Sequence, residues 1–190
     1  MTVIIKRHFD ILFPTTKTLK KVSVLHDTPL TPDGVEKSKI ISPELIDFFP
    51  FYLGISPRLR ARQSAKPIEE YFNIPPVIHT ALTSLNFLNT DTLAYVMKDH
   101  DGGEPPWKND WLKNAEYIEN QDDYMIRVIQ CIKRIIKKNP SHNILIVGHL
   151  ETIWSAEYLV RKLSLKDAIK THVDFGDTRT YSKEEFLRAA

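Results

Sequence analysis

The sequence has 190 residues, of which 42% are hydrophobic and 26% are charged, with a net charge of +2. These values fit one soluble globular domain with a sizeable core, and so small a charge gives no support for a nucleic-acid or membrane partner. Cys131 is the single cysteine, which excludes an intrachain disulfide, and no apolar run reaches the ~18 residues that a membrane span needs. Because the start of the chain has no signal-peptide pattern, we expect a cytoplasmic protein.

The first predicted element is a buried strand over residues 2–8. It holds three consecutive β-branched apolar residues and ends at Arg7 and His8. A continuous apolar run is typical of a strand that is buried on both faces of a parallel sheet. In open α/β sheets, ligands bind at the carboxyl ends of the strands. A guanidinium suits phosphate or carboxylate and an imidazole can act as a nucleophile, so this strand end is the first candidate site.

The middle of the chain is predicted to alternate short helices with strands. After a polar loop over 9–29, the expected order is helix 32–41, helical turn 43–48, strand 51–55, helix 56–72 and a weak strand 76–79. Thr31 is a good N-cap and Pro32 a good first helical residue, which fixes the start of the first helix. Pro67 lies inside the longer helix and should bend it.

Residues 80–118 show no clear period and are predicted to be a loop or lid insertion in a single domain over 1–190. The rest of the chain alternates again, as helix 120–138, strand 143–147, helix 151–162, strands 172–175 and 178–181, and a closing helix. Ser182 and Glu185 form a capping box that starts this last helix. The alternation predicts an α/β fold, a three-layer α/β/α arrangement with a mostly parallel central sheet.

Three of the predicted strands end in residues that carry chemistry. Two end in a histidine, His8 and His149, and the third ends at Ser56. Three arginines begin the helix that follows this third strand: Arg58, Arg60 and Arg62. In a parallel sheet these strand ends lie at one edge. One imidazole there could attack a phosphorus atom, while the guanidiniums and the second imidazole neutralise the phosphoryl oxygens.

Four short motifs follow one another along the chain. Residues 7–9 read Arg-His-Phe, residues 27–34 read Asp-Thr-Pro-Leu-Thr-Pro-Asp-Gly, residues 56–65 read Ser-Pro-Arg-Leu-Arg-Ala-Arg-Gln-Ser-Ala, and residues 148–149 read Gly-His. Together they resemble the motifs of the histidine phosphatase superfamily, the group that includes the cofactor-dependent phosphoglycerate mutases. That family has Arg-His-Gly, Asp-Thr-Pro-Leu-Thr-x-x-Gly, Ser-Pro-x-x-Arg-Ala-x-x-Thr-Ala and a late strand ending in His. The resemblance extends over nearly the whole chain.

The resemblance implies a phosphoglycerate mutase-like fold and a phosphatase that works through a phosphohistidine. It implies His8 as the nucleophile, and Arg7, Arg60 and His149 as the phosphate pocket. The spacing Ser-Pro-x-x-Arg singles out Arg60, and the two neighbouring arginines are expected at the surface or at the pocket rim. No cofactor is expected, and the spacing of the other histidines predicts no metal site.

The chain departs from the family pattern in three places. Phe9 stands where the family has glycine, and Ser84 stands where many members have the Glu of Leu-x-Glu-x-x-x-Gly. After His149 the family has Gly-Gly or a pair beginning with Asp, whereas this chain has Leu150 and Glu151. We expect Phe9 and Leu150 to contact the substrate.

The missing acid has a chemical consequence. An alkyl phosphate expels a poor leaving group that needs a proton, an effect of about 10²–10⁴-fold. A phenolate, an acyl phosphate or a protonated phosphoramidate leaves more readily. Four other carboxylates are candidate donors: Asp99, Asp101, Glu104 and Glu151. Glu151 is the nearest to the predicted pocket in sequence.

The leading hypothesis is a phosphatase that acts on a small phosphorylated substrate or a phosphoprotein. A protein phosphohistidine phosphatase is an alternative, because short members of that kind also lack the Glu and share His-Leu with residues 149–150. A catalytically weakened member that only binds a phosphate ligand is another alternative, and a mutase has the least support. The basic pairs at 133–134 and 137–138 lie opposite the apolar stripe of their helix and are expected to form a solvated face.

Overall fold

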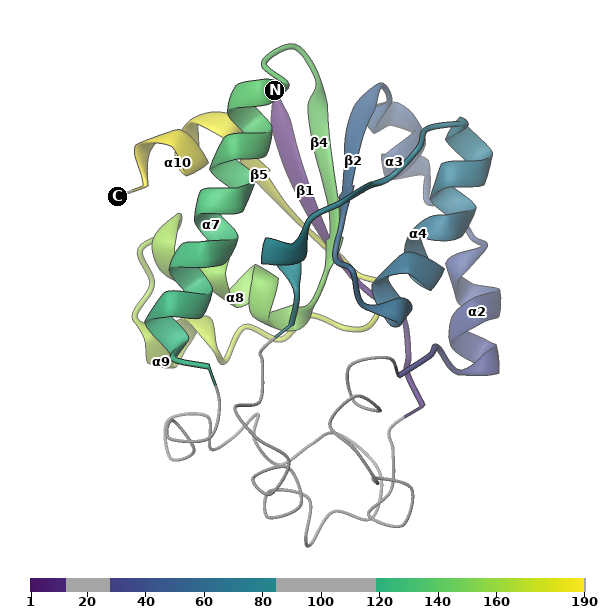
Figure 1. Cartoon of the computed structure of the whole chain (residues 1–190), viewed down its shortest axis with the longest axis horizontal. Coiled ribbons are helices and arrows are strands. Elements are labelled where there is room, and N and C mark those ends of the chain that lie inside the picture. Colours follow the sequence, from purple (N-terminus) through teal and green to yellow (C-terminus); the bar gives the residue numbers. More distant parts are fainter. Residues whose placement is uncertain (13–27, 85–118, 190) are drawn as a thin grey trace, which may run out of the picture.

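Five strands form the central sheet, in the order β3-β2-β4-β1-β5 (Figure 1). The computed structural model describes residues 1–12, 28–84 and 119–189. The strands are β1 (Thr2–Arg7), β2 (Phe51–Ile55), β3 (Val77–Ile78), β4 (Asn143–Gly148) and β5 (Thr178–Ser182). β1 to β4 run parallel, while β5 pairs antiparallel with β1. The predicted α/β class with a mostly parallel sheet is therefore confirmed.

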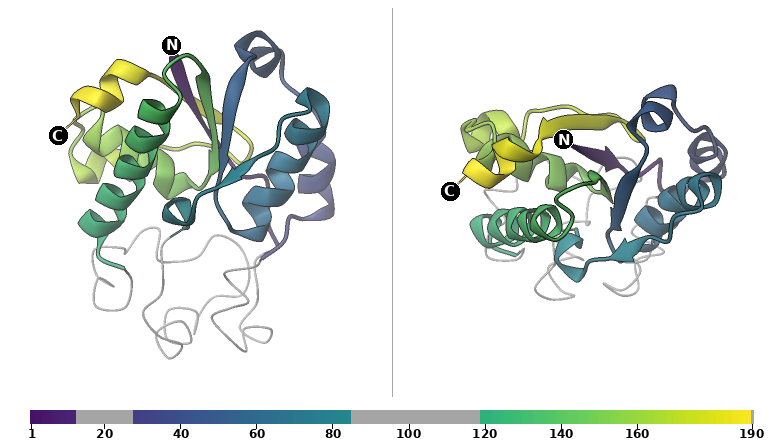
Figure 2. Two further views of the ribbon diagram at one scale, coloured as in Figure 1. Left: turned by 45° about the horizontal axis from the view of Figure 1, so that its top comes forward. Right: turned by 90° about the horizontal axis from the view of Figure 1, so that it is seen from above.

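Helices cover both faces of this sheet. On one face lie α2 (Pro32–Ser38), α3 (Pro43–Phe48) and α4 (Leu59–Phe72); on the other lie α7 (Gln121–Lys138), α8 (Leu150–Leu159) and α10 (Lys183–Arg188) (Figure 2). A short 3-10 helix, η1 (Thr80–Leu82), follows β3, and α9 (Leu165–Ala168) follows α8. Within the described ranges, no helix combines the length and the apolar character needed to cross a bilayer.

The two faces of β1 belong to two different halves of the core. Val3 and Ile5 pack into the cluster formed with α7 and α8, while Ile4 packs into the cluster formed with α3 and α4. β4 alternates in the same way, so both central strands are buried on both faces. A slip of one residue would exchange the two faces, which fixes the register and places Arg7 opposite Gly148.

Two predictions for the last part of the chain differ from the structure. The strand predicted over 172–175 is wrong, because these residues form an irregular loop. Their alternating apolar pattern has another cause: Val173 is buried in the core and Phe175 packs on Arg7. The helix α9 was not predicted, since its four residues are too few to show a period.

The predicted insertion begins with an ordered element. Residues 80–84 contain η1, whereas residues 85–118 lie outside the described residues, as do residues 13–27 of the polar loop. The lid role given to 80–118 therefore stays a prediction.

Candidate active site

The carboxyl ends of β1, β2 and β4 meet at one edge of the sheet. The His8 amide donates to the Gly148 carbonyl at 3.0 Å, and the Ser56 amide donates to the Val147 carbonyl at 3.0 Å. These bonds extend the parallel pairing by one residue beyond each strand. They bring the rings of His8 and His149 to a centroid distance of 5.3 Å in an edge-on arrangement. The two predicted imidazoles are therefore neighbours.

The hydrogen bond of His8 selects its tautomer. Its Nδ1 lies 2.8 Å from the carbonyl oxygen of Phe9. A carbonyl can only accept, so Nδ1 carries the proton and the Nε2 of the neutral ring keeps its lone pair. Two further hydrogen bonds hold the backbone of Phe9 in place. The Phe9 amide donates to Ser64 Oγ at 3.0 Å, and the Ser64 hydroxyl donates to the Arg60 carbonyl at 2.8 Å. Nε2 of His8 is thus held in a form suited to nucleophilic attack.

His149 lies deeper than His8 and has a different partner. Its Nε2 is 2.8 Å from Ser56 Oγ, and its buried Nδ1 has no hydrogen-bond partner in the described part of the chain. Burial lowers the pKa of His149 well below its ordinary value of 6.5. Repulsion from Arg60, from His8 when its ring is protonated, and from Arg58 lowers the pKa further. The ring is therefore neutral at neutral pH. A bound anion would offset these cations.

Two guanidiniums are buried at this edge, which is rare for arginine unless it serves a partner or a ligand. Arg7 is 4% exposed and Arg60 is 7% exposed. Arg7 Nη1 donates to the Val173 carbonyl at 2.6 Å, and its guanidinium carbon lies 3.7 Å from the centre of the Phe175 ring. Both cations depress the pKa of His149, so their charges act on the same small volume.

The loop between α9 and β5 holds the end of β1 in place through backbone hydrogen bonds. The Arg7 amide donates to the Asp177 carbonyl at 2.9 Å, and the Gly176 amide donates to the His8 carbonyl at 3.2 Å. The Phe175 ring lies 5.5 Å from the His8 ring. Sequence reasoning missed these residues, because it read the segment as a strand. The one signal for a turn was Gly176, which has a φ of +83°.

Phe9, in the place of the family's glycine, is turned against this loop. It is 8% exposed, and a Cβ at Gly176 would lie 2.4 Å from its ring. The Lys6 ammonium lies 4.9 Å from the ring centre and donates to the Gly176 carbonyl. Burial lowers the pKa of Lys6, which the charges of Asp177 and Glu44 partly oppose. The contact of Phe9 with substrate stays a prediction.

Leu150 is buried and Arg58 is half-buried, which bears on the roles expected of them. Leu150 is 4% exposed and belongs to the hydrophobic core, which favours a packing role over a substrate contact. Arg58 was expected at the surface or the rim. It is half-buried, its amide donates to Ser56 Oγ at 3.3 Å, and its charge contributes to the low pKa of His149. Arg62 is exposed, as expected.

Glu151, one of the candidate proton donors, contacts Ser84, the residue that stands where the family has its Glu. Ser84 Oγ donates to Glu151 Oε1 at 3.5 Å, and Glu151 is half-buried in the first turn of α8, two residues after His149. Asp101 and Glu104 lie outside the described residues, as does Asp99. A carboxylate on α8 therefore contacts the residue that stands in the sequence where the family has its Glu.

Comparison with known proteins agrees with this arrangement. The family model of the histidine phosphatase superfamily (branch 1) matches residues 7–184. No curated protein sequence gives a significant match.

Several solved phosphatases share the fold. The mycobacterial glucosyl-3-phosphoglycerate phosphatase with inorganic phosphate has a TM-score of 0.70 and 16% identity, covering 95% of this chain and 89% of that one. The alpha-ribazole phosphatase from Shigella flexneri has a TM-score of 0.66 and 21% identity, with coverages of 95% and 89%. The phosphoserine phosphatase from Entamoeba histolytica, in complex with 3-phosphoglyceric acid, has a TM-score of 0.64 and 16% identity, with coverages of 94% and 89%. From the family match over most of its length, the chain belongs to the histidine phosphatase superfamily.

Proposed function

We propose that the protein is a phosphatase that hydrolyses phosphoric monoesters through a phosphohistidine on His8. The hydrogen bond from His8 Nδ1 to the Phe9 carbonyl carries this proposal, because it puts the ring proton on Nδ1 and so makes Nε2 the nucleophilic nitrogen, at an edge that also holds buried guanidiniums. Family membership supports it, as do relatives named as phosphatases for glucosyl-3-phosphoglycerate, alpha-ribazole and phosphoserine. On this basis we expect a small phosphorylated substrate.

In the first step, the lone pair on His8 Nε2 attacks phosphorus. The N–P bond forms while the P–O bond to the leaving group breaks, and its electrons pass to the leaving oxygen. Negative charge is spread over the three remaining oxygens, where Arg7, Arg60 and His149 stabilise it. Because these groups are buried and already positioned, they need little reorganisation during the reaction.

We further propose that Glu151 is the acid, in place of the family's glutamate. Its carboxyl group, when protonated, gives its proton to the leaving oxygen. The resulting carboxylate then takes a proton from water, whose oxygen attacks the phosphorus of phospho-His8. The P–N bond breaks, its electrons return to Nε2, and inorganic phosphate leaves. The cycle restores the protonated Glu151 and the neutral His8.

The nucleophile is tested by the turnover of p-nitrophenyl phosphate. We expect His8→Ala to lower kcat/KM by at least about 10³-fold, since it removes the atom that forms the intermediate. His142→Ala is the matched control, because His142 is exposed at the far end of β4, and its activity should equal that of the wild type. Mass spectrometry of acid-free quenched samples should find a phosphoryl group on His8. Equal rates in wild type and His8→Ala would refute the mechanism.

The acid is tested by comparing an alkyl with an aryl phosphate. For Glu151→Gln, kcat should fall by about 10²–10⁴-fold with the alkyl ester and far less with p-nitrophenyl phosphate, whose leaving group needs little protonation. Ser84→Ala removes only the contacting hydroxyl and should have a small effect on both. If Glu151→Gln changes neither rate, Glu151 is not the donor.

The same experiments separate the alternatives. Turnover of a phosphohistidine peptide by both wild type and Glu151→Gln, without turnover of an alkyl ester, would favour a protein phosphohistidine phosphatase. Binding of phosphate without turnover of any substrate and without a phosphoenzyme would favour a member that only binds its ligand.

A further inference from the structure

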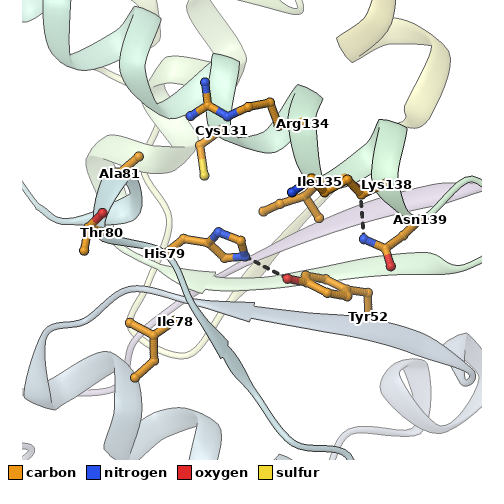
Figure 3. A pocket seen from close by; sticks show the side chains of 10 residues that line it. All are labelled: Tyr52, Ile78, His79, Thr80, Ala81, Cys131, Arg134, Ile135, Lys138 and Asn139. Carbon is orange, nitrogen blue, oxygen red and sulfur yellow. Dashed lines mark hydrogen bonds between the residues drawn. The ribbon is translucent and has the colours of Figure 1, made fainter.

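A cavity with several polar side chains lies near the β3 edge of the sheet, on the face that α7 covers. It is separate from the candidate active site. It is open to solvent and lies between β2 and β3 on one side and the C-terminal half of α7 on the other (Figure 3). Its volume is about 250 Å³, and it shares no residue with the candidate active site. Its polar lining consists of Tyr52, His79, Thr80, Cys131, Arg134 and Lys138, with Asn139 at its end. We name it the cationic cavity.

The charges in the cationic cavity are all of one sign. Arg134 and Lys138 lie one helical turn apart on α7, on the side that faces His79 (Figure 3). Among the residues that the structure describes, no aspartate or glutamate lines the cavity, and neither cation forms an ion pair with a carboxylate. Both side chains are exposed, as expected for a solvated face, and they also line the cavity. Lys137, next to Lys138, is exposed and does not line the cavity, so it provides a natural comparison.

The other polar groups supply neutral donors. Tyr52 Oη and His79 Nε2 are 2.8 Å apart. If the phenol donates, the ring keeps its proton on Nδ1; if Nε2 donates, the phenol proton is left over. Either arrangement leaves one donor for a ligand. Burial, followed by the charges of Lys138 and Arg134, lowers the pKa of His79, and burial raises the pKa of Cys131, so both are uncharged at neutral pH.

We propose that the cationic cavity is a second, non-catalytic binding site for a small oxyanion of the phosphate or sulfate class. Two cations, one imidazole–phenol pair and the Thr80 hydroxyl border a volume far above the roughly 10–15 Å³ that one water needs. A tetrahedral oxyanion of five heavy atoms fits this space with some of its waters. Guanidinium and ammonium groups bind such anions through charge-assisted hydrogen bonds.

Occupation of the site is coupled to the proton on His79. In the described part of the chain, the titratable groups that face His79 are Tyr52 on β2 and Cys131, Arg134 and Lys138 on α7. An anion between the two cations offsets their effect and raises the pKa of His79. By linkage, sulfate, whose own charge is constant near neutral pH, binds more tightly as the pH falls toward the pKa of His79.

The proposal is tested by NMR titration of the full chain with inorganic phosphate and, separately, with sulfate. The chain has seven histidines, and the variant His79→Gln identifies the imidazole signal of His79. Ligand in the candidate active site moves the signals of His8 and His149, whereas ligand in the cationic cavity moves that of His79. The two sites are thereby read independently, and failure at one leaves the other intact.

We expect a saturable shift of the His79 signal and a higher His79 pKa at saturation. The double variant Arg134→Gln/Lys138→Gln should weaken this binding by about tenfold or more, because it removes the charge from two hydrogen bonds. Lys137→Gln, which removes one charge from the same helix end, should bind as the wild type does. An unchanged His79 signal, a signal that shifts equally in the double variant, or equal weakening by Lys137→Gln would overturn the proposal.

Discussion

Two regions of the molecule combine the same chemical groups in opposite surroundings. The candidate active site joins an imidazole, a hydroxyl and two cations: His149, Ser56, Arg7 and Arg60. The cationic cavity also joins an imidazole, a hydroxyl and two cations: His79, Tyr52, Arg134 and Lys138. At the edge these side chains are almost fully buried, whereas both cations of the cavity are exposed.

This difference in burial decides what each region can do. Charges that are held in a dry, fixed arrangement act strongly on a reacting group and need no reorganisation, as transition-state stabilisation requires. Exposed charges are screened by water and salt, so they suit reversible binding instead. On the two proposals, burial separates a catalytic site from a binding site where residue types alone do not.

The largest effect that tests this contrast comes from removing one cation in each region. We expect Arg60→Ala to lower kcat/KM for p-nitrophenyl phosphate by about 10²–10³-fold, because a buried transition-state donor is lost. Arg134→Ala should stay within about twofold of the wild type, because surface charges far from a reaction contribute little. Steady-state kinetics of the two variants measures the contrast. Similar losses would mean that the two regions are functionally one.

A second comparison concerns a glycine beneath each region. Gly176→Ala should lower the free energy of unfolding by about 2–4 kcal/mol, because a Cβ at a φ of +83° is strained and would lie 2.4 Å from the Phe9 ring. Gly54→Ala, beneath the cavity, should cost about 1 kcal/mol, because its close contact is the flexible end of the Ile146 side chain at 2.9 Å. Urea unfolding measures both values. Equal costs would contradict the strain assigned to Gly176.

The last comparison concerns the dependence of stability on pH. A histidine whose folded-state pKa is lowered binds fewer protons when folded, so stability is present above pH 6.5 and is lost as the pH falls. For fully buried His149, this loss approaches about 1.4 kcal/mol per pH unit below roughly pH 6. We expect a shallower slope in His149→Gln than in wild type, measured by urea unfolding between pH 5 and 7. His79→Gln should change the slope less, because His79 is only half-buried. The reverse order would contradict the assigned burial effect.

Much of the fold follows from local patterns. The apolar runs predicted β2 with its observed bounds, and β1 and β4 to within one residue, because a strand buried on both faces leaves an unbroken apolar signal. The placement of His8 and His149 at one edge also followed, since parallel strands share a carboxyl edge. The prediction needed only the type and the order of the elements.

The missed features depend on contacts between distant residues. The carbonyl that accepts from Arg7 belongs to Val173, 166 positions away, and no local pattern marks a residue for such a contact. The pairing of Ser56 with His149 is equally non-local. The helical period of α7 placed Arg134 and Lys138 opposite the apolar stripe, but it gave no information on β3 beside them. Periodicity identifies the face of a helix and not its neighbour.

The position of β1 in the sheet means that its neighbouring strands are synthesised long after it. β1 is the first strand of the chain, yet its two hydrogen-bonded neighbours are β4 and β5, and the backbone of Arg7 and His8 bonds to residues 148, 176 and 177. Translation proceeds from the N-terminus, so the nascent chain carries these two residues long before it contains the segments that hold them. A polypeptide released early by the ribosome would therefore have the proposed nucleophile, His8, without the backbone that orients it. Such fragments are expected to have no phosphatase activity.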